Sequence, residues 1–392
     1  MAHSDVSGLD IKCGGRAVKL LLVGGYADSL LNFRGPLIDD LLKAGVEVHV
    51  AAPGLNDSCM SDALRARGVT PHSLNLQRTG MNPLADLGSL YGLWSLMRRL
   101  RPNVFLGYTI KPVIYGSLAA WLAGVGGRYA LITGLGYAFQ DRPHTAKARL
   151  VAGLARRLYR YALSRATKVF FQNPDDEALF RTLNILNPRT PSIVVNGSGV
   201  DIQEFDQFEP PQDPIVFLMI ARLLVAKGVR EYVQAAKQLR AEFPSVQFLL
   251  AGWLDEGPDS VEAQELAAWE DEGVVEYLGR LTDVRPALRR CSVYVLPSYR
   301  EGTPRTVLEA MAVGRAIITT DAPGCRETVT NGHNGYLVPV RSVESLGNAM
   351  RCLLDSPNDI QRFGYASRRL AEEKYDVKKV NAVMLREMGV KS

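Results

Sequence analysis

The feature that most constrains this chain is a repeated alternation of short apolar strands and helices. In the first half, strands are expected at residues 19–25, 46–52, 103–107, 129–133, 168–172 and 192–195. Helices are expected between them, at about 34–44 and 115–123. Continuous apolar strands that alternate with helices are typical of a parallel sheet covered on both faces. The first half therefore predicts an α/β domain.

The same alternation restarts after an acidic, Pro-rich break at residues 201–214, which we interpret as an interdomain linker. Further strands are expected at 215–220, 246–251, 274–278, 293–296 and 316–319, with helices at 229–242, 306–312 and 367–388. We predict an α/β protein of two doubly wound domains facing each other across a cleft at the carboxyl ends of their strands. The expected ranges are an N-terminal acceptor-side and membrane-side domain at 1–205, a C-terminal donor domain at 206–375, and a final helix at 376–392 that returns to the N-terminal domain.

Composition excludes several classes of protein. Of 392 residues, 47% are hydrophobic and 22% are charged, as in ordinary globular proteins. No apolar run is long enough for a transmembrane helix, and the N-terminus lacks the apolar core of a signal peptide, so we expect a cytoplasmic protein. The five cysteines are widely spaced, without a C-x-x-C pair, which predicts neither a metal site nor a disulfide framework.

Positive charge is concentrated in the first half. Residues 1–200 hold 23 Lys and Arg against 13 Asp and Glu, and the segment 142–168 holds eight basic residues and no acidic one. Leu150, Leu154, Leu158 and Tyr161 recur there at helical spacing, which predicts a basic amphipathic helix. Two interpretations stay open: a solvated face of a packed helix, or a contact with anionic lipid or a lipid diphosphate. The candidate contacts are Lys111, Arg149, Arg156, Arg157 and Arg160.

Arg222 and Lys227 follow an expected strand and precede an expected helix. Both would lie at the carboxyl end of the strand, where fixed cations can hold a diphosphate. An exposed loop pair without a ligand is the alternative.

The segment Tyr299–Ala312 joins another strand to a helix and carries Glu301 in the loop and Glu309 inside the helix. Pro304 suits the first helical turn, and the free N–H groups that follow it would hold a phosphate. The candidates in this loop are Gly302, Thr303, Pro304, Arg305 and Thr306. Because helical side chains lean toward the N-terminus, Glu309 can reach the same place and accept hydrogen bonds from sugar hydroxyls.

Gly24 and Gly25 end the first strand, and Gly25 would let a ligand approach the backbone closely. The segment is not the G-x-G-x-x-G dinucleotide fingerprint, and the chain has no P-loop motif. It also has no D-x-D triplet, the obvious carboxylate clamp for a divalent ion. Arg222, Lys227 and the helix terminus would then do the work of the metal.

The loop R-E-G-x-P-R-x-x-x-E-A-M-A resembles the E-x7-E motif of the retaining glycosyltransferase family 4. Segments 221–232, 195–201 and 323–329 fit the same pattern, and the resemblance runs from about Lys19 to the end. It implies a GT-B fold, a nucleotide-sugar donor, and no metal or other cofactor. It also implies that Arg222 and Lys227 hold the diphosphate, that Glu309 binds the ribose, and that Glu301 contacts the donor sugar near its reacting face.

Three further segments, at 32–34, 108–112 and 131–139, resemble bacterial N-acetylgalactosaminyltransferases that extend sugars linked to undecaprenyl diphosphate. One departure is visible, because many family members carry a His where this chain has Thr133 and Gly134. A catalytic His contact with the donor sugar is therefore not expected here.

We thus expect a retaining, metal-independent hexosyltransferase or N-acetylhexosaminyltransferase. It would move a sugar, GalNAc by the subgroup resemblance, from a UDP-sugar to an undecaprenyl-diphosphate-linked sugar at the inner face of the plasma membrane, without nucleic acid. Glu301, Arg222 and Lys227 would be its catalytic residues. The alternatives are a UDP-sugar enzyme with another acceptor, a UDP-N-acetylhexosamine 2-epimerase, and a non-catalytic protein that binds nucleotide sugars.

Overall fold

The computed structural model describes residues 17–56, 59–76, 83–134, 146–255, 257 and 259–390, without the side chains of residues 146–148. Arg142, the side chain of Lys147 and residues 135–139 of the segment 131–139 lie outside the described part. The chain divides into two compact units. Unit 1 comprises Met1–Ser198 and Lys378–Ser392, and unit 2 comprises Gly199–Val377.

Unit 1 is built on a parallel sheet of seven strands in the order β3-β2-β1-β4-β5-β6-β7. The strands are β1 Lys19–Val23, β2 Glu47–Ala52, β3 Thr70–Ser73, β4 Val104–Tyr108, β5 Gly127–Ile132, β6 Lys168–Phe171 and β7 Ser192–Val194. The helices are α1 Asp28–Asn32, α2 Gly35–Lys43, α3 Cys59–Ala66, α4 Pro83–Leu100, α5 Ser117–Ala123, α6 Ala146–Leu163, α7 Pro174–Thr182 and α14 Val377–Glu387. The predicted α/β domain is confirmed.

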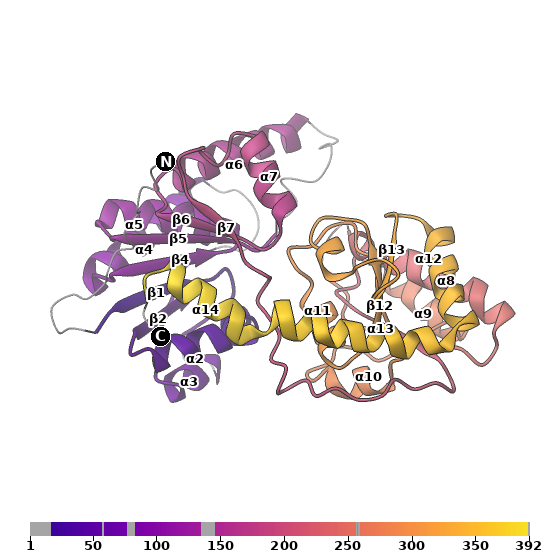
Figure 1. The fold of residues 1–392 in the computed structure, drawn as a ribbon. Helices are drawn as coiled ribbons and strands as arrows, with labels where there is room; N and C mark the ends of the chain where they lie inside the picture. The colour runs from indigo at the N-terminus through magenta and orange to yellow at the C-terminus, as the bar shows by residue number, and fades with distance from the viewer. Residues whose placement is uncertain are drawn as a thin grey trace, which may run out of the picture. The chain divides into compact units, whose positions relative to one another are not determined.

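Helices cover both faces of this sheet (Figure 1). Leu64 of α3 and Met384 of α14 pack with Leu20 and Leu106 on one face. On the other face, α4, α5, α6 and α7 bury side chains such as Leu93, Ala120, Tyr159 and Phe180. Apolar side chains therefore point to both faces of the central strands, as the continuous apolar runs predict.

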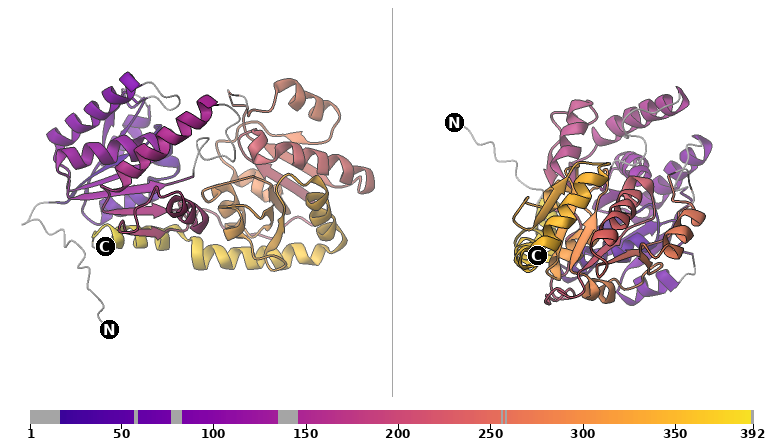
Figure 2. Two further views of the ribbon diagram at one scale, coloured as in Figure 1. Left: turned by 90° about the horizontal axis from the view of Figure 1, so that it is seen from above. Right: turned by 90° about the vertical axis from the view of Figure 1, so that its right-hand side faces the viewer.

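Unit 2 repeats the plan with a parallel sheet of six strands in the order β10-β9-β8-β11-β12-β13. The strands are β8 Val216–Ile220, β9 Gln247–Ala251, β10 Glu276–Tyr277, β11 Val293–Leu296, β12 Ala316–Thr320 and β13 Gly335–Val338. The helices are α8 Val229–Glu242, α9 Ala263–Asp271, α10 Arg285–Arg290, α11 Arg305–Ala312, α12 Val343–Asp355 and α13 Pro357–Leu370. Figure 2 shows two further views of the ribbon.

The linker expected at 201–214 is not where the chain changes units. These residues lie in unit 2, where Phe205 is buried in the core and Phe208 packs against it. The chain instead passes between the units after Ser198 and again after Val377. The acidic, Pro-rich composition suggested a linker, but its two aromatic side chains hold the segment on unit 2.

The final helix expected at 367–388 is also interrupted. Helix α13 ends at Leu370, a π-helical turn spans Ala371–Tyr375, and α14 begins at Val377. At the interruption Val200 donates its N–H to the Tyr375 carbonyl at 2.8 Å, and Val377 donates to the Val200 carbonyl at 3.0 Å. Pairing with Val200 replaces the helical hydrogen bonds there. Among the described helices, none is long and apolar enough to cross a membrane.

Candidate functional site

The predicted diphosphate cation Lys227 lies in a turn that the fold of unit 2 holds tightly. The turn follows β8 and ends at Gly228, whose φ is +74° and where an added Cβ would lie 2.2 Å from the Pro297 carbonyl oxygen. Only glycine accommodates both that backbone conformation and that approach. The turn after β8 is therefore fixed against the end of β11.

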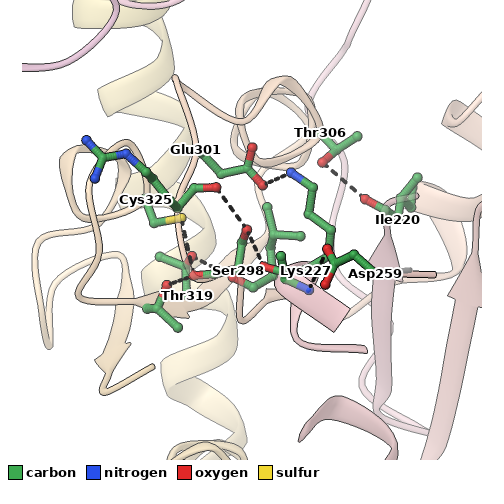
Figure 3. A network of polar contacts seen from close by, with 12 residues as sticks. Ile220, Lys227, Asp259, Ser298, Glu301, Thr306, Thr319 and Cys325 are labelled. Carbon is green, nitrogen blue, oxygen red and sulfur yellow. Dashed lines mark hydrogen bonds and ion pairs between the residues drawn. The ribbon is translucent and has the colours of Figure 1, made fainter. Parts of the chain in front are cut away.

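Two of the three predicted catalytic residues, Lys227 and Glu301, are brought together by this packing. Lys227 Nζ donates to Glu301 Oε1, and their side chains are 18% and 14% exposed (Figure 3). The Tyr299 N–H donates to the Ala226 carbonyl at 2.9 Å, and the Glu301 N–H donates to the Pro323 carbonyl at 2.9 Å. Hydrogen bonds on both sides of the loop therefore position Glu301.

A second set of polar contacts supports the loop that carries Glu301. Ser298 Oγ donates to the Ala226 carbonyl at 3.3 Å, and the Thr320 hydroxyl donates to the Ser298 carbonyl (Figure 3). Thr306, a predicted phosphate contact, donates its hydroxyl to the Ile220 carbonyl at 3.3 Å. Gly302 and Thr303 lie in the loop just before, and Thr306 joins α11 to the end of β8.

Arg222, the other predicted cation, is paired with a carboxylate that the sequence did not single out. Its Nη1 donates to Asp255 Oδ2 at 2.7 Å, and the Arg222 side chain remains 37% exposed. Asp255 lies 33 positions along the chain, after β9, and no local spacing links the two residues. Only knowledge that β8 and β9 are neighbours could have identified this partner.

Glu309, the predicted ribose contact, is buried within α11. Arg305 Nε donates to Glu309 Oε1 at 2.7 Å, and the Glu309 residue is 5% exposed. Burial raises the pKa of the Glu309 carboxyl, and the Arg305 charge opposes that shift. Pro304, expected in the first helical turn, instead precedes it, because α11 begins at Arg305.

The glycines at the end of β1 are needed for packing within unit 1. An added Cβ would lie 2.4 Å from Tyr108 Oη at Gly24 and 2.6 Å from Thr109 Oγ1 at Gly25. Tyr108 Oη in turn lies 2.8 Å from Ser29 Oγ. Close approach of the Tyr108 and Thr109 side chains accounts for both glycines. Gly25 belongs to unit 1, whereas the other predicted nucleotide-sugar residues belong to unit 2.

Lys111, a predicted acceptor contact, is engaged in a buried ion pair. Its Nζ donates to Asp86 Oδ1 of α4 at 2.7 Å, and the two side chains are 11% and 9% exposed. The hydrogen bond and negative charge of Asp86 also help to raise the pKa of the neighbouring Tyr115, after the larger effect of burial. The Asp86 carboxylate thus neutralises the Lys111 charge.

The basic helix is confirmed as α6, but most of its apolar stripe does not face the core; of the four predicted stripe residues, Leu158 alone packs partly against it. Leu150, Leu154 and Tyr161 are 73%, 45% and 48% exposed, whereas the buried positions are mainly Ala152, Ala155, Tyr159, Ala162 and Leu163. Small side chains let α6 approach the sheet closely. Most of the apolar stripe and much of the charge therefore face outward.

The four arginines of α6 do not form one free cluster. Arg149 and Arg157 are exposed, and Arg156 is half-buried. Arg160 donates from Nε to the Asn184 carbonyl at 2.6 Å, so it binds the chain just after α7. Arg149 and Arg157 are the members best placed to meet an external anion.

Within the described ranges, no group of three or more His, Cys, Asp or Glu side chains has the arrangement of a metal site. The predicted site residues of unit 2 take part in three cation–carboxylate pairs: Arg222–Asp255, Lys227–Glu301 and Arg305–Glu309. Such pairs can release a cation toward a more highly charged anion such as a diphosphate.

Comparisons with known proteins agree for both units. Residues 201–370 match the family described as glycosyl transferases group 1, and residues 35–197 match the family described as glycosyl transferase 4-like domain. A curated relative from Campylobacter jejuni is N,N'-diacetylbacillosaminyl-diphospho-undecaprenol alpha-1,3-N-acetylgalactosaminyltransferase. It is 30% identical over 341 residues, which cover 83% of this chain and 87% of the relative.

Another relative, from Escherichia coli, is UDP-Gal:alpha-D-GlcNAc-diphosphoundecaprenol alpha-1,3-galactosyltransferase. It is 26% identical over 281 residues, 68% of this chain and 70% of that protein. Among solved structures, Anabaena HepE in complex with UDP aligns with a TM-score of 0.72 at 18% identity, over 94% of this chain and 99% of that one. At that identity the structural likeness supports the fold alone.

Proposed function

The chain belongs to the group 1 glycosyltransferases of the GT-B fold, and on that premise we propose that it transfers a sugar from a UDP-sugar to an undecaprenyl-diphosphate-linked sugar. We propose GalNAc as the sugar, a choice supported by the name of the 30% identical relative. A role in the assembly of a bacterial surface polysaccharide or glycan follows from the same acceptor.

The observation that carries the proposal is the pairing of Lys227 with Glu301 at the carboxyl end of the unit 2 sheet, with Arg222 on the adjoining turn. When the glycosidic bond breaks, negative charge develops on the departing diphosphate. Lys227 and Arg222 would stabilise that charge better than they stabilise the bound substrate, which is what lowers the barrier. Fixed cations of this kind would take the place of a divalent metal.

Glu301 and Glu309 would orient the donor. Glu301, held beside Lys227, would contact the donor sugar near its reacting face, and Glu309 would accept hydrogen bonds from the ribose. The backbone N–H groups of Gly302 and Thr303 would bind the phosphates. We propose retention of configuration, by attack of the acceptor hydroxyl on the face that the diphosphate leaves, with a phosphate oxygen taking the proton.

The helix layer of α4, α5 and α6 supports a membrane-side role for unit 1. Among the described residues of unit 1, every exposed large apolar side chain except Phe33 lies on these three helices: Leu84, Leu87, Tyr91, Trp121, Leu122, Leu150, Leu154 and Tyr161. The only acidic residue in α4, α5 and α6 is Asp86, which is buried against Lys111. An apolar and basic surface suits an anionic bilayer, whereas two copies of it would repel each other.

We therefore propose a peripheral protein at the inner face of the plasma membrane, with Arg149 and Arg157 directed to anionic headgroups or to the diphosphate of the acceptor. The direct test incubates the purified chain with a panel of UDP-sugars, an undecaprenyl-diphosphate-linked sugar and EDTA, and measures the mass of the lipid product. We expect one donor to add one sugar residue without added metal. Release of UDP without a lipid product would refute the acceptor, and no reaction or UDP binding with any donor would refute the transferase. The anomeric configuration of the product, measured by NMR, tests retention.

A further inference from the structure

The strand order of unit 2 sets the order of side chains along one edge of its sheet. The order β10-β9-β8-β11 places Arg280 after β10, Trp253 after β9, Arg222 after β8 and Glu301 after β11. On the proposed function, Arg222 meets the diphosphate and Glu301 the sugar. An extended nucleotide sugar with those two contacts would direct its nucleoside toward β9 and β10.

Trp253 has an open surface at that position. Its side chain is 42% exposed, and the Arg280 guanidinium lies 5.0 Å from the centroid of its ring. By contrast, the other tryptophan of unit 2, Trp269, packs against the core. Trp253 is not among the side chains that pack against this core. An exposed indole with a cation at its face resembles the stacking surfaces on which proteins bind flat heterocycles.

The backbone around Trp253 is fixed to the turn that carries Arg222. The Leu223 N–H donates to the Trp253 carbonyl at 3.0 Å. Gly252 has a φ of +150°, and an added Cβ there would lie 1.8 Å from the Ala221 carbonyl oxygen. Asp255, two positions after Trp253, accepts from Arg222. The indole and the proposed diphosphate cation are therefore held on neighbouring, mutually bonded loops.

We propose that Trp253, backed by Arg280, forms a stacking surface for the nucleobase of the donor; this inference rests on the proposed function. Stacking uses the π-face that every base offers, so the surface adds affinity without selecting the base. Selection of uracil would fall to other contacts.

The test measures the binding of UDP and of inorganic diphosphate by calorimetry to the full chain and its variants. Trp253→Ala is expected to raise the Kd of UDP about tenfold, the loss typical of one stacked base, and to leave that of diphosphate unchanged. Trp253→Phe should retain most of the affinity. Because UDP lacks the donor sugar, a loss with UDP identifies the nucleoside as the stacked group.

Trp121→Ala is the matched control. Trp121 of unit 1 is 37% exposed, and the Arg165 guanidinium lies 4.5 Å from the centroid of its ring. It therefore has the same kind of environment as Trp253 but belongs to the other unit. We expect no change in UDP affinity. In addition, UDP should quench tryptophan fluorescence in the unaltered chain and in Trp121→Phe, but much less in Trp253→Phe.

The outcomes separate the two proposals. If the unaltered chain binds UDP and Trp253→Ala binds it equally well, the stacking surface is refuted and the transferase proposal stands. Equal losses of UDP and diphosphate binding would also refute it, because they would indicate damage to the Arg222 turn. If the unaltered chain binds no UDP, both proposals fail together.

Discussion

The carboxyl edges of the two sheets differ although the sheets follow the same plan. In unit 2 this edge carries the pair Arg222–Asp255, with side chains 37% and 33% exposed, and the more buried pair Lys227–Glu301, with side chains 18% and 14% exposed. In unit 1 the corresponding edge carries Gly24 and Gly25, packed against Tyr108 and Thr109. The predicted acceptor-side cations of unit 1 that are exposed, Arg149, Arg157 and Arg160, lie instead on α6, beside exposed apolar side chains.

The difference teaches that a common fold does not fix where the chemistry lies. A few cations held by tight turns suit a small, highly charged ligand. A broad layer of helices with apolar and basic side chains suits an extended surface. We therefore infer a division of labour, in which unit 2 binds the nucleotide and unit 1 faces the lipid.

The largest expected effect comes from removing a cation of unit 2. Arg222→Ala should lower kcat/KM for transfer by about 10²–10³-fold, the usual loss when one charge-stabilising group is removed from an active site. Steady-state kinetics would measure it. Arg351→Ala is the control, because Arg351 of α12 is also an ion-paired arginine. The Arg351 side chain is 35% exposed and that of Arg222 is 37% exposed. Near-normal turnover in Arg222→Ala would remove this residue from the site.

The next effect concerns the buried ion pair of unit 1. Asp86→Asn leaves Lys111 without a counter-charge and should lower the unfolding free energy of unit 1 by about 3 kcal/mol. Replacing both residues by apolar ones should recover much of the loss. Hydrogen exchange in α4 under increasing urea reports on unit 1 separately, which a single melting curve of two units does not.

The exposed pair Arg65–Asp62 provides the control for that experiment, with side chains 52% and 74% exposed. Asp62→Asn should cost less than about 1 kcal/mol. A stable Asp86→Asn variant that has lost activity would instead make Lys111 and Asp86 part of the working site, and would weaken the contrast between the units.

Gly228 tests whether the backbone of unit 2 positions the cations. Gly228→Ala adds a Cβ 2.2 Å from the Pro297 carbonyl oxygen at a φ of +74°. We expect a loss of about 1–3 kcal/mol in stability and weaker UDP binding, because the Lys227 turn must move. In Gly273→Ala the φ is similar, +64°, but nothing lies within 4 Å of the added Cβ. That variant should share the backbone cost and keep UDP affinity; equal UDP binding by the two variants would contradict the proposed role of the turn.

The smallest effect concerns the surface of unit 1. Arg157→Ala should weaken binding to vesicles containing anionic lipid by about fivefold, which corresponds to about 1 kcal/mol for each basic side chain near such a surface. Sedimentation with vesicles measures it, and raised salt should abolish the difference. Arg362→Ala in unit 2 should bind like the unaltered chain. If both variants lose affinity equally, the membrane contact is not specific to unit 1.

Much of the fold follows from local sequence. Helix α8, Val229–Glu242, and strand β11, Val293–Leu296, begin and end where the apolar pattern indicates. The edge strands β3 and β13 were not predicted, because Pro71 in β3 and the short, half-buried β13 give little apolar signal. The other two edge strands, β7 and β10, were predicted, because their apolar runs at 192–195 and 274–278 are visible in the local sequence.

The candidate site divides in the same way. Arg222, Lys227, Glu301 and Glu309 could be chosen from motif spacing, but their partners could not all be. Arg222 meets Asp255 only because β8 and β9 pair, and Lys111 meets Asp86 only because α4 packs against the segment after β4. The outward direction of the α6 apolar stripe likewise depends on Ala152 and Ala155 facing the sheet. Motif spacing identifies a charge, whereas the tertiary fold decides what neutralises it.

The measurement that tests the division of labour most directly is hydrogen–deuterium exchange of the full chain with and without saturating UDP. We predict slower exchange in peptides covering residues 222–228 and 299–309 of unit 2, and unchanged exchange in α4 and α6 of unit 1. Unchanged exchange at 222–228 and 299–309, with UDP bound, would contradict the assignment of the nucleotide to unit 2.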